Sequence, residues 1–133
     1  MNHYVPILQE HVSGAKLDLD ELLDRAGMLV LTLTDSNGQC TQLKFDSYMA
    51  YRKVDEGDAL LTLSAMRRSG GCSKCLYRVD DSDFLAWFNA ERCGQVPGQP
   101  LVHYSIATVN DIVDVLSFDP PAIEVKEVTV EEG

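Results

Sequence analysis

Basic residues are scarce in this chain of 133 residues, which has 11 Lys and Arg against 21 Asp and Glu and a formal net charge of −10 at pH 7. The imbalance is concentrated in residues 79–133, where 11 acids face only Arg92 and Lys126, a net charge of −9. Such a chain repels the phosphate backbone of a nucleic acid. We therefore do not expect nucleic acid as a partner.

Long apolar runs are also missing from the sequence, and we expect no export leader in residues 1–10. No apolar stretch approaches the roughly 20 residues that cross a bilayer, and residues 1–10 contain no Lys or Arg before an apolar segment. We expect a cytoplasmic protein without a membrane segment. In the cytosol the four cysteines (Cys40, Cys72, Cys75 and Cys93) would stay reduced, so we expect no disulfide framework.

The remaining composition is that of a globular domain, with 45% hydrophobic and 24% charged residues. No internal repeat or linker interrupts the chain. We predict a single α+β domain over residues 1–133: an antiparallel sheet of about five or six strands built from hairpins, with two or three helices packed on it.

Local patterns in the first half predict two helices and a hairpin. The capping-box spacing of Asp18 and Glu21 favours a helix over 18–26, ended by Gly27. Residues 28–34 and 41–45 alternate around a turn at Asn37-Gly38, which is typical of a β-hairpin. The segment 48–54 fits a strand or the approach to a helix, and a second helix is expected through Ala59, Leu60, Leu63 and Met66.

The second half predicts a strand over 76–79 and a helix capped by Asp81 or Ser82 that ends near Gly94. Its aromatic residues Phe84, Trp87 and Phe88 are expected to form a core stripe rather than a ligand platform. A second hairpin is expected over residues 102–106 and 113–115, and a last strand begins at Ile123.

His103, Ser105 and Asp114 fall on one face of this second hairpin. A two-residue turn at Asn110-Asp111 would pair His103 with Phe118, which places His103 and Asp114 about 13 Å apart. That separation is too large for a base and the carboxylate that orients it. The pattern therefore predicts a mixed face that binds a partner or is covered by a helix, rather than a catalytic triad.

Cys72 and Cys75 have the spacing of one zinc knuckle or of a redox pair. Neither chemistry has clear support, because no second knuckle follows Cys93 and the pair precedes a strand instead of opening a helix. Two incidental cysteines in a loop are the default interpretation. We expect no cofactor.

The segment from Leu76 through Trp87-Phe88 to the run His103–Asp111 resembles sequences of small acidic immunity proteins from bacterial toxin–immunity pairs. The resemblance implies a non-enzymatic cytoplasmic protein that neutralises a cognate toxin, for example a basic nuclease, through an acidic surface. Under this hypothesis Leu116 is a further apolar candidate, and the partner-binding residues are Asp80, Asp81, Asp83, Asp111, Asp114, Asp119, Glu124 and Phe118.

Two alternatives stay open at this point, as does the oligomeric state. One is a small zinc- or ligand-binding module that uses Cys72 and Cys75. The other is an enzyme with a concave site that joins His103, Ser105 and Asp114, or Tyr51 and Arg52.

Overall fold

The computed structural model describes residues 2–8, 16–68, 75–93 and 100–127. The elements in chain order are β1 (His3–Pro6), β2 (Asp18–Arg25), β3 (Met28–Thr34), β4 (Gln39–Phe45), β5 (Tyr48–Asp55), η1 (Glu56–Asp58), α1 (Leu60–Arg68), β6 (Leu76–Asp80), α2 (Asp83–Glu91), β7 (Val102–Ala107), β8 (Asp111–Ser117) and β9 (Ala122–Glu127). The fold is α+β with antiparallel strands, as the sequence predicts. No helix within these ranges is long and apolar enough to span a bilayer.

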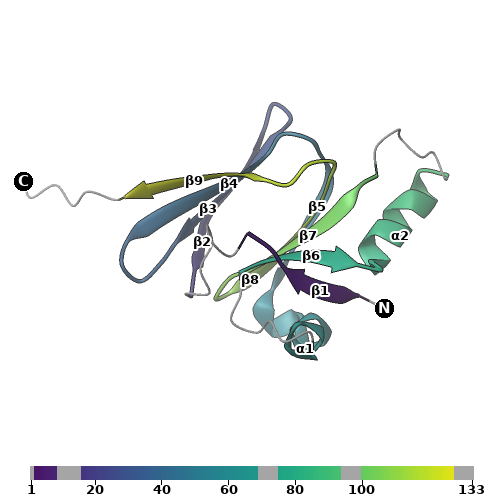
Figure 1. The fold of residues 1–133 in the computed structure, drawn as a ribbon, viewed down its shortest axis with the longest axis horizontal. Helices are drawn as coiled ribbons and strands as arrows, with labels where there is room; N and C mark the ends of the chain where they lie inside the picture. Colours follow the sequence, from purple (N-terminus) through teal and green to yellow (C-terminus); the bar gives the residue numbers. More distant parts are fainter. Residues whose placement is uncertain (1, 9–15, 69–74, 94–99, 128–133) are drawn as a thin grey trace, which may run out of the picture.

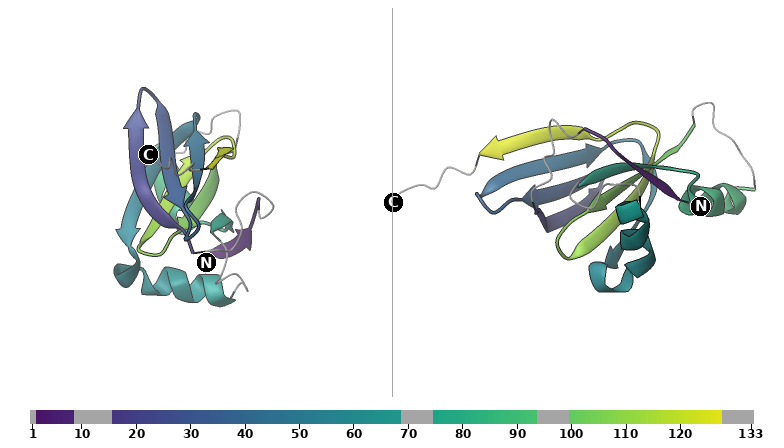
Figure 2. Two further views of the ribbon diagram at one scale, coloured as in Figure 1. Left: turned by 90° about the vertical axis from the view of Figure 1, so that its left-hand side faces the viewer. Right: turned by 60° about the horizontal axis from the view of Figure 1, so that its bottom comes forward.

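The strands divide between two sheets. The larger has the order β1-β6-β7-β8-β5 and the smaller the order β2-β3-β4-β9. Figure 1 shows the smaller sheet on one side of the larger sheet, with α1 and α2 beside the larger sheet, and Figure 2 shows the same arrangement from two further directions. The larger sheet is therefore the middle layer and has two covered faces.

Apolar side chains fill the space between the sheets. Leu29, Leu31 and Leu33 alternate along β3 and are completely buried. They belong to one cluster with residues of β7 and β8, among them Ile106 and Val113. A second cluster lies on the other face of the larger sheet and joins Tyr4, Tyr77, Val79 and Ile112 to Ala59 and Met66 beside and within α1. We call the face toward the smaller sheet the inner face and the face toward the helices the outer face.

The predicted helix over 18–26 is wrong, because this segment forms β2. The register of β2 against β3 shifts between Leu19 and Glu21, a β-bulge. The bulge places Leu19 and Leu22, three residues apart, on the same core-facing side. A three-residue spacing is also the signature of a helix, and pairing along the whole of β3 outweighed the helical preference of the segment.

The hairpin β3–β4 and the α1 and α2 helices are confirmed, and the ambiguous segment 48–54 lies in strand β5. Gly38 has the positive φ of 82° that the turn requires, and Asp35 closes that turn with its carboxylate. Ser82, one of the two predicted caps, is the N-cap of α2 and accepts a hydrogen bond from Leu85 N–H.

The hairpin β7–β8 is confirmed, but its predicted register is wrong by two residues. Its turn consists of Val109 and Asn110, and Thr108 closes it by hydrogen bonds of 2.9 Å from its N–H and its hydroxyl to the Asp111 carbonyl. The threonine side chain takes part in closing the turn, which the Asn-Asp pattern did not predict. His103 consequently pairs with Leu116 and not with Phe118.

Candidate functional site

A chain of buried polar groups crosses the outer face of the larger sheet. The His103 imidazole is completely buried; its Nδ1 lies 2.6 Å from Ser82 Oγ, and its Nε2 lies 2.7 Å from Asp114 Oδ1. Nε2–H donates to the Asp114 carboxylate, and Nδ1 shares a hydrogen bond with the Ser82 hydroxyl. Both ring nitrogens are thus used inside the protein.

The predicted separation of about 13 Å between His103 and Asp114 is wrong. With the observed register, Asp114 is the diagonal neighbour of His103 across the β7–β8 ladder, close enough for their side chains to meet. Ser105 lies directly opposite Asp114, yet its buried hydroxyl has no hydrogen-bond partner in the described part of the chain. The serine that contacts His103 is Ser82, from another element.

Arg52 of β5 extends this series of polar contacts to the protein surface. Its Nε donates to Asp114 Oδ2 at 3.0 Å, and its side chain is half exposed. Burial alone would raise the pKa of Asp114, but the hydrogen bond and charge of His103, together with the guanidinium of Arg52, hold that pKa below its ordinary value. Asp114 is therefore an ionised, buried anchor.

The Ser82–His103–Asp114 geometry does not provide a nucleophile. The Ser82 oxygen accepts the Leu85 N–H at 3.0 Å as the cap of α2, and the residue is buried. A catalytic serine must instead present its hydroxyl to a substrate. The arrangement joins α2 to the sheet.

A groove of about 370 Å³ opens beside this chain, lined by Ala50, Tyr51, Arg52, Phe84 and Trp87; we call it the β5–α2 groove. The Arg52 guanidinium lies 4.3 Å from the centroid of the Phe84 ring. Trp87 stacks on Phe84 with 5.9 Å between centroids and 17° between planes. The edge-to-face contact of Phe84 with His103, at 5.5 Å, connects the groove to the buried chain.

Trp87 does not belong to the core, so the predicted aromatic stripe is only partly correct. Phe84 is buried, but the side chain of Trp87 is 56% exposed. Their positions three residues apart do not reveal which of them the sheet covers, because α2 has only nine residues and is apolar on more than one side. Only the docking of the helix distinguishes the two rings.

A second set of hydrogen bonds holds β5 in place. Asp24, at the end of β2, accepts hydrogen bonds from the hydroxyls of Tyr48 and Tyr51. The hydrogen bond to Asp24 raises the pKa of Tyr48, and partial burial together with the Asp24 charge raises that of Tyr51. The edge strand that carries Arg52 is thereby linked to the smaller sheet.

The carboxylates predicted to bind a partner do not lie on one face. Asp80, Asp81 and Asp83 are exposed at the start of α2, and Arg78 pairs with Asp80 at 2.9 Å. The other four are separated: Asp111 and Asp119 lie at opposite ends of β8, Asp114 is buried, and Glu124 pairs with Lys44 on the smaller sheet. Of the predicted apolar contacts, Phe118 is half-buried and Leu116 is completely buried.

Only one of the two paired cysteines, Cys75, lies in the described part of the chain. Cys72 lies outside the described residues, whereas Cys75 is 2% exposed and packs in the inner cluster. Burial raises the pKa of Cys75 to about 12, so its thiol is protonated at neutral pH. In the ranges that the structure describes, no three His, Cys, Asp or Glu residues gather in a metal-binding group.

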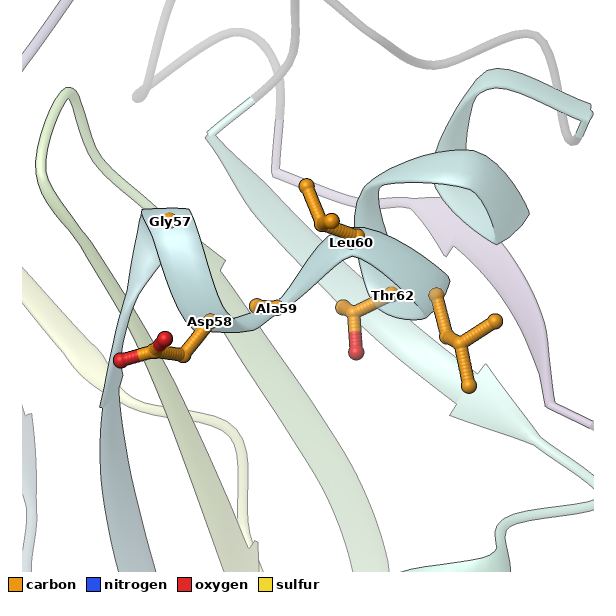
Figure 3. A pocket seen from close by; sticks show the side chains of 6 residues that line it. Gly57, Asp58, Ala59, Leu60 and Thr62 are labelled. Carbon is orange, nitrogen blue, oxygen red and sulfur yellow. The ribbon is translucent and has the colours of Figure 1, made fainter.

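A wider depression of about 510 Å³ lies at the start of α1, lined by residues 57–62. In Figure 3 the side chains of Asp58, Leu60 and Thr62 point in different directions. They do not converge on a common point, which a specific ligand site requires. The β5–α2 groove is the better candidate.

Comparison of the chain with protein-family models, curated proteins and solved structures gave no match.

Proposed function

We propose that this protein is a non-enzymatic binding module for a basic partner protein. Its contact surface consists of the β5–α2 groove and the exposed carboxylates of Asp81 and Asp83, and we call this the α2 surface. A toxin domain as the partner follows from the sequence resemblance to immunity proteins. The expected partner-binding surface is thus one helix and its surroundings instead of the whole acidic half of the chain.

The observation that carries the proposal is the exposure of Trp87. It is the only tryptophan in the chain, it is 56% exposed, and its ring stacks on the ring of Phe84. Tryptophan and arginine are enriched among the residues that dominate the binding energy of protein interfaces, and tryptophan buries a large, rigid area at a small entropic cost. Trp87 and Arg52 line the same groove.

The charge around α2 favours a basic partner. Residues 80–91 contain four acids, Asp80, Asp81, Asp83 and Glu91, and no Lys or Arg. Asp83 and Trp87 are four residues apart in α2 and therefore share one side of the helix. A cationic side chain of a partner could contact both the ring face and the carboxylate.

Binding of the protein encoded by the neighbouring reading frame tests this proposal. Trp87→Ala should weaken that complex by about 30-fold, the effect of losing about 2 kcal/mol at a hot spot. Leu61→Ala is the matched control, because Leu61 is an 88% exposed apolar residue of the other helix; its affinity should equal the wild type. An unchanged affinity of the Trp87 variant, or no binding of the neighbouring product, would contradict the proposal.

Small-molecule binding is the second candidate, supported by the volume of the groove, which lies within the range of ligand sites. The groove contains Tyr51 and Arg52, the pair that the enzyme alternative named. None of its described lining residues is a Ser, Cys, His, Asp or Glu that could act as nucleophile or base, and His103 has both nitrogens engaged. The geometry therefore supports binding better than catalysis.

A further inference from the structure

His103 connects the two walls of the β5–α2 groove, and we propose that it is a positioning residue that sets the relative placement of Trp87 and Arg52. The inference deepens the proposed function, on which its biological meaning rests. It concerns a residue that has no exposed surface and cannot touch a partner.

The α2 wall is attached to His103 at its first turn. Ser82 caps the helix through Leu85 N–H and contacts His103 Nδ1 with the same oxygen. Phe84, in the first turn of the helix, places its ring edge-to-face with the imidazole at 5.5 Å. Two contacts of different kinds thus fix the start of the helix that carries Trp87.

The β5 wall is attached through Asp114. Asp114 uses one oxygen for His103 and the other for Arg52, at 2.7 and 3.0 Å. The Arg52 guanidinium then lies against the Phe84 ring at 4.3 Å. Together with the helix backbone between Ser82 and Phe84, these contacts form a closed ring, Ser82–His103–Asp114–Arg52–Phe84, and His103 is the member that joins the helix to the carboxylate.

Ser105 shows that position on the outer face alone does not create this role. It lies on the same strand and the same face as His103, directly opposite Asp114, and is completely buried. Its hydroxyl nevertheless lacks a hydrogen-bond partner among the described residues. Ser105→Ala is therefore a matched control. It removes a buried polar group beside the closed ring of contacts and leaves every contact of that ring in place.

Trp87 itself supplies the measurement. As the only tryptophan, it reports the groove in the isolated protein through acrylamide quenching of its fluorescence. His103→Asn keeps an amide near the Nδ1 position and loses the contact to Asp114, whereas His103→Gln keeps an amide near Nε2 and loses the contact to Ser82. Each variant thus breaks one of the two hydrogen bonds of His103. In both variants we expect α2 and β5, the two walls of the groove, to be held less firmly.

We expect both His103 variants to raise the quenching constant of Trp87 by about 1.5-fold, because release of the helix start exposes the ring. The ceiling is about 1.8-fold, since Trp87 is already 56% exposed. Ser105→Ala should leave the constant at the wild-type value. Ser82→Ala should raise the constant as well. That variant leaves the His103–Asp114 pair intact, so it serves as the test if the His103 variants do not fold.

Folded His103 and Ser82 variants with wild-type quenching would overturn the positioning role and leave His103 as an ordinary buried hydrogen-bonding residue. An equal rise in the Ser105 variant would do the same, because the effect would then be a general loosening of the outer face. These results need no partner. They are therefore independent of whether Trp87→Ala weakens binding, which decides the proposed function.

Discussion

The two faces of the β7–β8 hairpin have the same backbone and different chemistry: the inner face is apolar, whereas the outer face mixes polar residues with the apolar Ile112 and Leu116. The inner face presents apolar residues such as Tyr104, Ile106 and Val113 to the leucines of the smaller sheet. The outer face presents His103, Ser105 and Asp114, all completely or nearly completely buried. Apolar contacts need only area and fit, whereas buried polar groups need particular partners. The inner face therefore serves stability, and the outer face places the groove.

The largest effect in this comparison is expected on the inner face. Ile106→Ala should lower the free energy of unfolding by about 4 kcal/mol, because a completely buried side chain leaves a cavity between two sheets that cannot collapse freely. Urea unfolding measures the change. Val109→Ala, at the partly exposed turn of the same hairpin, is the control, and a comparable loss there would contradict the assignment of stability to the inner face.

On the outer face, Asp114→Asn should cost about 2 kcal/mol at pH 7, because charge-assisted hydrogen bonds to His103 and Arg52 are weakened in a buried place. The folded pKa of Asp114 is lowered, so its contribution is present above the unfolded value of about 3.9 and is lost as the pH falls below it through the folded value. Urea unfolding at several pH values should show the difference between wild type and variant shrinking in that acidic range. A difference that stays constant down to acid would show that the charge of Asp114 does not stabilise the fold.

The smallest effect is expected at the exposed end of the α2 surface. Asp83→Asn should lower the association rate with the basic partner by about twofold at low salt, and the effect should fade as salt is added. Asp58→Asn, an exposed acid in the first turn of η1 and outside the α2 surface, is the matched control. Stopped-flow association rates decide between them, and equal slowing by both variants would indicate overall charge instead of a local contact.

Much of the fold could be predicted from local sequence patterns, and the failures have definite physical causes. Alternation in 28–34 and 41–45 identified the hairpin β3–β4, and Ser82, the N-cap of α2, is one of the two caps that the sequence predicts. β2 was mistaken for a helix because its bulge gives the core-facing leucines a helical spacing. Such a bulge depends on a partner strand, which a local pattern does not contain.

The candidate site was predictable only in its parts. The sequence placed His103 and Asp114 on one face, which is correct, but a register error of two residues separated them. Two residues of register preserve the face and change every neighbour, because side chains alternate with a period of two. The link from His103 to Ser82 joins positions 21 residues apart on different elements, and no spacing rule connects them.

The sequence by itself determined the α+β class, the antiparallel hairpin partners and the acid-rich start of α2, because these follow from alternation, turn residues and composition within short segments. Only the tertiary structure decided that Trp87 is exposed while Phe84 is buried, and that Ser82, His103, Asp114 and Arg52 meet. Exposure and hydrogen bonding depend on which elements cover each other. That is set by the packing of helix on sheet, where the register of a single hairpin decides which polar groups become neighbours.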